Sequence, residues 1–477
     1  MRNGWLRPAR TASCLLILLC LVVPVRAAEP SADDADYYEL MKTFVDSFEQ
    51  IDRNYVKDVD RRELIEAAIE GMLTKLDPYS SYISPDELAR FTQDVEQEFG
   101  GIGIQVQIDP ESKRLTVMTP LPGTPAYKAG IHAGDIIMEI EGKSTEGFSI
   151  QDAVKLLKGK PGEEVTIGVL HVGDKKLEQI KLTRDIIHVS TVLGDRYGEG
   201  DQWDYMLDPE NGIGYVRLTH FSRHTTDELR KALDQLSNEG MKALVLDLRF
   251  NPGGLLTQAR DVADLFIRDG KIVSTRGRNT VDRVLSATRA GTYPDFPMVV
   301  LVNRYSASAS EIVSACLQDH KRAIIVGERT WGKGSVQNVI DLDAGKSALK
   351  LTTASYHRPS GQNIHRFPGA TDDDVWGVMP DEGNALKMDA VELRQHLEHR
   401  RDRDVIKADG PPASDYRDRH LARALDVLKE KLGVKPATDT AKSNGAPEPP
   451  PLPIERERSD ARSQLLPILV PAPPRAA

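Results

Sequence analysis

Three short segments between residues 247 and 337 carry the residue types that acyl-transfer chemistry needs. Residues 247–254 (DLRFNPGG) place paired glycines after an apolar run, and paired glycines let backbone N–H groups approach a ligand. Residues 303–311 (NRYSASASE) place serines at the start of a helical pattern, where backbone donors and the helix dipole favour a nucleophile. Residues 327–337 (GERTWGKGSVQ) place a lysine between glycines, and burial would lower its pKa. Taken singly, each segment also fits an ordinary turn or a helix cap.

The sequence also offers residues for two other kinds of site. The lysine segment nearly matches a phosphate-binding loop, but Gly334 stands where a Ser or Thr would bind magnesium. A His-based triad would need His220 or His224 oriented by Asp247, yet no G-x-S-x-G elbow is present. The eleven histidines also lack metal spacing such as H-E-x-x-H, and we expect most of them at the surface.

Alternating strands and helices from about residue 212 must position the three segments. Nearly continuous apolar runs predict buried strands, and leucines at helical spacing predict amphipathic helices. The expected strands are 214–218, 243–248, 299–302 and 323–326, and the expected helices are 227–236, 255–267 and 308–318. This alternation predicts an α/β core.

The first 185 residues have a different texture. Apolar residues at helical spacing predict helices within 35–97, interrupted by a turn at 77–81, with a new helix capped by Ser84 and started by Pro85. Alternation predicts strands at 114–119 and 163–172 around a short helix over 150–157 that Ser149 caps. We therefore expect a small β-rich module of about 85 residues after the helices.

Read together, the segments resemble the carboxy-terminal processing peptidases, also called tail-specific proteases. The resemblance runs from about Tyr38 to Leu432 and includes the motifs at 77–82 (DPYSSY), 98–103 (EFGGIG), 358–361 (RPSG) and 379–381 (MPD). It implies an α/β fold: a crotonase/Clp-protease-like peptidase core with an inserted β-rich PDZ domain and helical N- and C-terminal segments. The implied domains are 35–97 (helical), 99–184 (PDZ), 190–385 (catalytic core) and 386–435 (helical).

The resemblance implies a serine endopeptidase that cuts proteins near their C-terminus. Ser308, the middle serine of 306–310, falls on the nucleophile, Lys333 on the general base and Gln337 on the residue that orients the base. The implied oxyanion hole consists of Gly253 or Gly254 together with the Ala309 amide. No metal or cofactor is implied.

The PDZ resemblance implies recognition of a substrate's C-terminus. The implied carboxylate-binding loop is Gly101, Ile102, Gly103 and Ile104, and Lys158 stands where the family often has arginine. The implied partners are proteins or peptides with free apolar C-termini, a second copy bound through the helical ends, and a regulatory adaptor. The competing classes are a catalytically silent PDZ-containing binding protein on the same fold and a PDZ peptidase with a chymotrypsin-like barrel.

The N-terminus predicts export. Three arginines precede the 12-residue apolar run Cys14–Val25, and small residues at 25 and 27 predict a signal peptide, 1–27, cut after Ala27. An uncleaved membrane anchor is the alternative. Cleavage would remove four arginines and no acidic residue, taking the net charge from −10 to −14, which disfavours nucleic acid as a partner. We expect a periplasmic or otherwise extracytoplasmic protein.

Two further features concern the mature chain. Its one cysteine, Cys316, lies in an apolar helical run and is expected to be a buried structural thiol. Residues 436–477 hold 10 of the 29 prolines and are expected to form a flexible tail. The Ala476–Ala477 end of this tail is a candidate ligand for the chain's own PDZ module.

Overall fold

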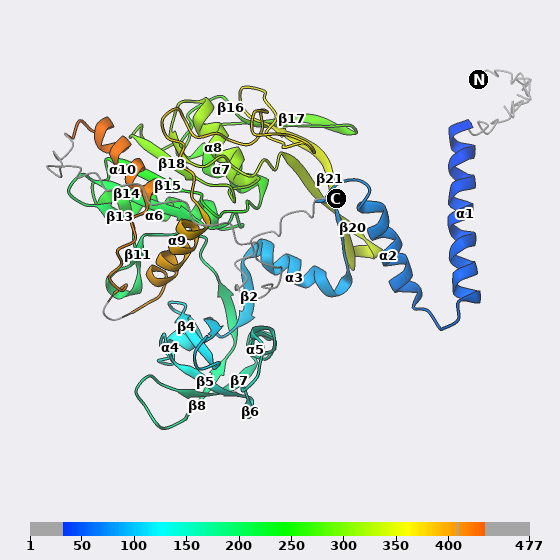
Figure 1. Ribbon diagram of the computed structural model, residues 1–477, viewed down its shortest axis with the longest axis horizontal. Helices are drawn as coiled ribbons and strands as arrows, with labels where there is room; N and C mark the ends of the chain where they lie inside the picture. Colours follow the sequence, from blue (N-terminus) through cyan, green and yellow to red (C-terminus); the bar gives the residue numbers. More distant parts are fainter. Residues whose placement is uncertain (1–31, 408–409, 435–477) are drawn as a thin grey trace, which may run out of the picture. The chain divides into compact units, whose positions relative to one another are not determined.

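The computed structural model describes residues 32–407 and 410–434 (Figure 1). The chain divides into two compact units, residues 1–68 and 69–477. The first contains α1 (Ala32–Asn54) and the start of α2 (Arg61–Leu73). The expected signal peptide, 1–27, and the expected tail, 436–477, lie outside the described residues.

A mostly parallel sheet forms the centre of the second unit. Its four parallel strands are β14 (Ile213–Leu218), β15 (Ala243–Asp247), β18 (Met298–Val302) and β19 (Ile324–Gly327), in that order. The antiparallel strands β10 (Val192–Leu193) and β13 (Met206–Asp208) both pair with β14. The parallel strands are apolar throughout because helices cover both of their faces.

Two hydrophobic clusters pack on the opposite faces of this sheet. One cluster joins it to α6 (Thr225–Asn238), α7 (Leu256–Asp264) and α8 (Ala309–Asp319). The other cluster joins it to α10 (Arg419–Lys431). Each of the three helices on the first face follows a strand of the sheet, and α8 follows β18 after the turn at 303–308 (Figure 1).

The second unit also contains a second sheet. Its strands are β1 (Ser81–Ile83), β16 (Lys271–Gly277), β17 (Thr280–Ser286), β20 (Ser335–Leu342) and β21 (Ser347–His357), with β21 pairing β1, β16 and β20. Helix α3 (Pro85–Glu96) follows β1, and α9 (Ala390–Arg403) precedes α10.

The β-rich module forms a separate antiparallel sheet with its own core. Its strands are β3 (Ile104–Ile108), β4 (Leu115–Pro120), β5 (Ile136–Ile140), β6 (Lys143–Ser144), β7 (Glu164–Leu170) and β8 (Glu178–Thr183), with α4 (Pro125–Lys128) and α5 (Ile150–Leu157) packed against them. The chain enters through β2 (Glu98–Gly101) and leaves through β9 (Asp185–His188), which pair with each other. This pair is the stem of the module.

Most predicted elements are confirmed, and the differences have physical causes. The helix expected over 255–267 ends at Asp264, although the residues after it stay buried. The turn expected at 77–81 is present at 77–80, where Asp77 accepts the Tyr79 and Ser80 N–H groups. Ser81 already belongs to β1, because Ser81 to Ile83 pair with β21 across a large sequence separation. Cys316 is buried, as predicted. Within the described residues, no helix combines the length and the apolar character that a membrane span requires.

Candidate active site

Ser308 occupies a strained position at the start of α8. Its backbone has φ 55° and ψ −110°, and only 7% of the Ser308 surface is exposed to solvent. Such a conformation costs a non-glycine residue about 1–3 kcal/mol, and strain of this kind concentrates at functional sites. The strand-to-helix turn 303–307 holds it in place, with Ser306 Oγ donating to the Leu248 carbonyl at 2.8 Å.

The buried carboxylate of Glu311 links Ser308 to the lysine segment. Glu311 Oε2 accepts the backbone N–H of Ser308 and of Lys333, each at 2.8 Å. Glu311 Oε1 accepts the Thr330 hydroxyl at 2.6 Å and the Gly332 N–H at 2.7 Å. Burial raises the pKa of Glu311, and these four donated bonds oppose that effect. One fully buried side chain therefore holds the serine and lysine backbones side by side.

The surroundings of Lys333 lower the pKa of its amine. Its pKa falls to about 8, chiefly because burial disfavours the ammonium and secondly because Lys350 adds a like charge. The carboxylates of Glu311 and Asp77 act in the opposite sense. The expectation that this lysine is desolvated is thus met by its surroundings.

The 77–82 motif contributes one wall of the lysine's surroundings. Tyr79 places its ring centroid 5.3 Å from Lys333 Nζ. Asp77 fixes the turn by accepting the Tyr79 and Ser80 backbone N–H groups at 2.7 and 2.8 Å. Ser80 Oγ in turn accepts the Thr352 N–H at 3.0 Å, which fastens the motif to β21. A segment more than 250 residues away in sequence therefore helps to exclude water from Lys333.

The paired glycines lie directly against the serine turn. A Cβ added to Gly253 would lie 2.8 Å from Ser308 Cβ and 3.0 Å from the Ala309 nitrogen. A Cβ on Gly254 would lie 2.3 Å from the Phe221 carbonyl oxygen, and both glycines have positive φ. The Gly253 N–H donates to Asn251 Oδ1 at 2.9 Å, so this amide already has a partner in the conformation described.

Gln337 lies in β20, which begins two residues after Lys333, and the expected carboxylate-binding residues lie in the β-rich module. Gln337 Nε2 donates to Ser335 Oγ at 2.8 Å and to Thr352 Oγ1 at 3.3 Å. In the module, the loop of Gly101, Ile102, Gly103 and Ile104 joins β2 to β3, and Ile102 is buried in the module's core. Lys158 Nζ lies 4.3 Å from the Phe99 ring centroid, next to this loop.

The described residues form neither the His-based triad nor the phosphate-binding loop. Asp247 is bound by Arg249 and by the Tyr215 hydroxyl at 2.7 Å, so it orients neither His220 nor His224. Burial lowers the pKa of His220 to about 4. The lysine segment leads into β20 and not into a helix, whereas a phosphate-binding loop opens a helix.

Comparison with known proteins identifies the family. The chain is 39% identical over 394 residues to the carboxy-terminal-processing protease of Bartonella bacilliformis, covering 81% of this chain and 86% of that one. The chain is a member of the carboxy-terminal processing proteases. The corresponding protease of Synechocystis sp. is 37% identical, covering 69% of this chain and 73% of that one. These proteases are serine peptidases, and the α/β peptidase core with a PDZ domain expected from the sequence is the fold of this chain.

Family models match three stretches of this processing protease. Residues 212–381 match peptidase family S41, residues 92–170 match the PDZ domain, and residues 24–87 match the N-terminal domain of the activating protease CtpB. The module's sheet continues beyond the PDZ match to Thr183. Among solved structures, a photosystem II D1 C-terminal processing protease is 32% identical with a TM-score of 0.41, covering 74% of this chain and 86% of that one.

Sequence reasoning missed Glu311 as a site residue. The signal was present, because Ser308 and Glu311 have the S-x-x-E spacing of a capping box. In an ordinary capping box the glutamate lies near solvent, whereas here burial lets the same carboxylate reach the lysine segment. Asp77, Tyr79 and Lys350 were also missed as neighbours of Lys333, since only the β1–β21 pairing brings them there.

Proposed function

We propose that this processing protease is an endopeptidase that cleaves exported proteins near their C-terminus, with Ser308 as nucleophile and Lys333 as general base. The observation that carries the proposal is the shared Glu311 carboxylate, which binds the backbone N–H groups of both residues. The strained backbone of Ser308 and the lowered pKa of Lys333 support it. Activated-serine catalysis requires a nucleophile and a base that the protein holds close together.

The proposed reaction begins with neutral Lys333. Its amine takes the proton of Ser308 Oγ as that oxygen attacks the scissile carbonyl carbon and forms the tetrahedral intermediate. The resulting ammonium then gives this proton to the leaving amine, and an acyl-enzyme remains. Neutral Lys333 next takes a proton from water as the water oxygen attacks the acyl carbon. The ammonium then returns this proton to Ser308 Oγ as its bond to the acyl carbon breaks, which releases the new C-terminus and restores the free serine.

The proposed oxyanion hole uses the amides of Ala309 and Gly254. The Ala309 nitrogen belongs to the first turn of α8, where the helix dipole favours negative charge. Gly253 contributes to the oxyanion hole because it has no side chain, since a Cβ at this position would clash with Ser308. Its own amide could donate to substrate only after leaving Asn251 Oδ1. Gln337 would orient Lys333 through its Oε1, which can accept an amine N–H, while Nε2 donates to Ser335 Oγ.

The PDZ domain, proposed to span 99–184, supplies substrate selection. We assign the carboxylate of a free apolar C-terminus to the backbone amides of the Gly101–Ile104 loop, where the peptide extends the sheet edge. Lys158 lies beside Phe99 and would add positive charge near that carboxylate. The lowered pKa of Lys158 reflects burial first, with Asp94 opposing the shift.

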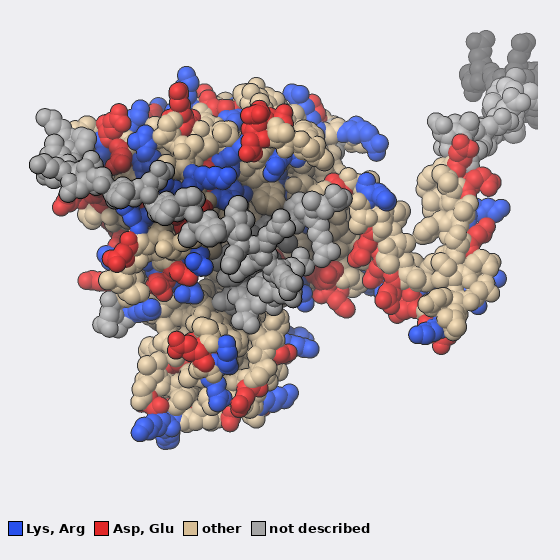
Figure 2. Space-filling view, viewed as in Figure 1, with Lys and Arg blue, Asp and Glu red and all other residues tan. Residues whose placement is uncertain are grey.

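Location and partners are also proposed from the sequence and from α1. The signal peptide at 1–27 would export the chain to the periplasm or another extracytoplasmic space. Helix α1 exposes a row of large apolar side chains, which suits association with a second copy or a regulatory adaptor. Figure 2 shows uncharged side chains over much of its visible face, whereas acidic and basic side chains intermix elsewhere. The exposed apolar residues of α1 are Tyr37, Tyr38, Leu40, Met41, Phe44, Val45 and Ile51.

The substrate proposal is tested with one peptide in two forms. An internally quenched peptide with an apolar C-terminal residue is offered as the free acid and as the amide. We expect the amide to be cleaved at least 10-fold less efficiently by the mature chain, because it removes the charge that the PDZ loop reads. Equal kcat/KM values for the two forms would contradict C-terminal recognition.

A further inference from the structure

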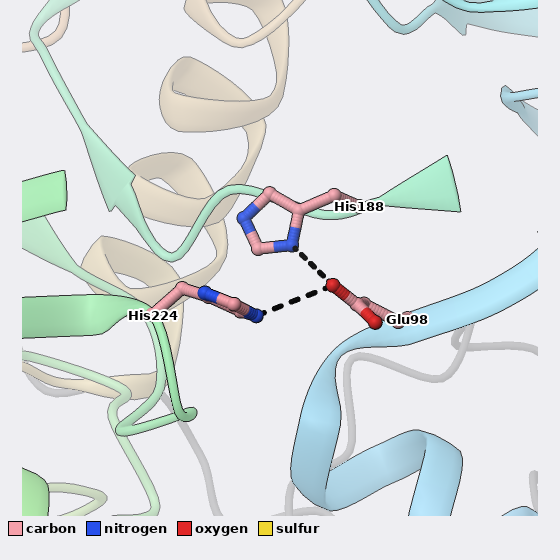
Figure 3. A group of neighbouring side chains, drawn as sticks. All are labelled: Glu98, His188 and His224. Carbon is pink, nitrogen blue, oxygen red and sulfur yellow. Dashed lines mark ion pairs between the residues drawn. The ribbon is translucent and has the colours of Figure 1, made fainter. Parts of the chain in front are cut away.

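Outside the active site, a histidine and carboxylate group joins the stem of the PDZ module to the protease core. Glu98 on β2 and His188 on β9 are direct cross-strand partners in the stem. His224 belongs to the core and occupies the N-cap position, directly before the first residue of α6. The three side chains point toward one another from these three elements (Figure 3). Each offers one ligand atom, and these atoms lie within 4.8 Å of one another.

Two of the distances within this group are close to those around a tetrahedral metal ion. Glu98 Oε1 lies 3.2 Å from His224 Nε2 and 3.6 Å from His188 Nδ1. Zinc binds such nitrogen and oxygen ligands at about 2.0–2.2 Å, which places neighbouring ligand atoms about 3.3–3.6 Å apart. One carboxylate oxygen thus faces two imidazole nitrogens at the spacing that a shared ion would impose.

A fourth residue, Glu228, determines which ring nitrogen of His188 is bound to a carboxylate and which faces Glu98. Its Nε2 lies 2.5 Å from Glu228 Oε1, and an ionised carboxylate only accepts, so Nε2 carries the proton. The other ring nitrogen, Nδ1, then faces Glu98. Glu228 is itself anchored, because its Oε2 accepts the backbone N–H groups of Thr191 at 2.8 Å and Val192 at 3.1 Å. A carboxylate behind a ligating histidine is the usual outer partner in zinc sites.

The local charge also calls for a cation. Arg223 precedes His224 in the chain, but its charge is neutralised by Glu96, whose two carboxylate oxygens accept from Arg223 Nε and Nη2. Glu98 and Glu228 then contribute two negative charges around two imidazoles. A divalent ion would balance both. The side chains of Glu98, His188 and His224 are 37%, 37% and 41% exposed, which leaves an open side for a water ligand and for metal entry.

We propose that Glu98, His188 and His224 bind a divalent transition metal, with zinc as the ion of choice, and that Glu228 orients His188. Two imidazoles and one carboxylate suit zinc, and three protein ligands leave one position for water. The bound ion fastens the two strands through which the chain enters and leaves the PDZ module to the start of α6. It is a structural clamp and takes no part in peptide hydrolysis.

A second histidine and carboxylate group in the described part of the chain provides a matched comparison. His132, Asp135 and His171 also bring their ligand atoms together. However, Asp135 is already occupied: Oδ2 accepts the His132 N–H and contacts His171 Nδ1, both at 2.8 Å, and Oδ1 accepts the Val172 N–H at 3.2 Å. These bonds close a turn, so we assign no metal to this group.

Zinc titration of the mature chain tests the clamp. The full mature chain is produced without a polyhistidine tag, freed of metal with a chelator, and titrated with Zn²⁺ by calorimetry. We expect one tight equivalent per chain, lost in His224→Ala and in His188→Ala and retained in His171→Ala. Glu228→Gln should keep the equivalent with affinity lowered by about 10–100-fold. Circular dichroism in chelator checks that each variant is folded.

Hydrogen exchange supplies an independent readout. Zn²⁺ should slow amide exchange in residues 98–101 and 185–188 of the unsubstituted chain and of His171→Ala, but not of His224→Ala. The proposal is overturned if the unsubstituted chain binds no tight equivalent, or if His224→Ala binds Zn²⁺ as tightly as the unsubstituted chain. It is equally overturned if the equivalent is lost in His171→Ala alone, or if stem exchange responds to pH and not to Zn²⁺.

Discussion

The ionisation of Lys333 should set the pH dependence of peptide cleavage. An ordinary lysine has a pKa of about 10.4, so only about 0.04% of it is neutral at pH 7. Burial and the neighbouring Lys350 bring the pKa of Lys333 to about 8, which makes about 9% neutral at that pH. The protein thus raises the fraction of usable base by about 200-fold.

The expected profile follows from that fraction. Because the neutral amine is the reactive form, kcat/KM should rise with pH along a single limb with unit slope. Its midpoint should lie near pH 8, giving about a 10-fold rise between pH 7 and pH 9 and a plateau above that. Protonating one group on the free enzyme explains the whole limb.

The assay uses a quenched peptide without groups that titrate between pH 6 and pH 10. Single-turnover measurements at several enzyme concentrations make acylation the observed step. Tryptophan fluorescence at each pH shows that the protein stays folded, and Ser308→Ala provides the blank. A flat profile, or a limb centred near pH 10.4, would refute the assignment of Lys333 as a desolvated base.

Three substitutions test the surroundings of the dyad. Lys350→Met removes a like charge and should move the pH–rate midpoint of Lys333 upward by about half a unit to one unit, measured with the same assay. Glu311→Gln should lower kcat by about 100-fold or more and lower the melting temperature. The reason is that an amide cannot accept all four donated bonds, and each unpaired buried donor costs about 1–3 kcal/mol. Gly254→Ala should destabilise the glycine turn and abolish cleavage, because its Cβ would lie 2.3 Å from a backbone carbonyl oxygen; calorimetry and kinetics measure both effects.

Each structural substitution has a matched control. Glu392→Gln changes another capping-box glutamate, at the start of α9 and away from the serine, and should leave kcat unchanged. Gly361→Ala places a side chain at a glycine that also has positive φ but has nothing within 4 Å of the added Cβ. If either control loses as much activity as its partner, the effects are general and the site geometry does not explain them. An unmoved midpoint in Lys350→Met would likewise contradict the electrostatic account of Lys333.

The sequence predicted elements and motifs better than it predicted contacts. Buried strands such as Ala243–Asp247 and the capped helices at Pro85 and Ile150 follow from local patterns, and all three are confirmed. The strand Ser81–Ile83 could not be foreseen, since three residues carry no periodicity and the strand exists only by pairing with β21. Local patterns therefore gave the segments that contain the serine and the lysine, the family resemblance singled out Ser308 and Lys333 within them, and neither gave what surrounds them.

Contacts between distant segments account for what was missed. The Glu311 carboxylate looks like an ordinary cap until the lysine loop is seen to donate to it. The histidines were expected at the surface, yet His396 and His420 are buried, and His188 and His224 meet Glu98 through the β2–β9 pairing and the start of α6. Such groupings depend on tertiary packing, which spacing along the chain does not record.

Mass spectrometry of a cleaved protein tests the central claim most directly. A folded substrate with a flexible, apolar, free C-terminus is incubated with the mature chain and with folded Ser308→Ala and Lys333→Ala variants, and all product termini are identified. The account predicts new C-termini close to the original end with the unsubstituted chain, and none with either variant. Continued cleavage by Ser308→Ala or Lys333→Ala, or cuts spread evenly along the substrate, would contradict a Ser308–Lys333 peptidase that processes C-termini.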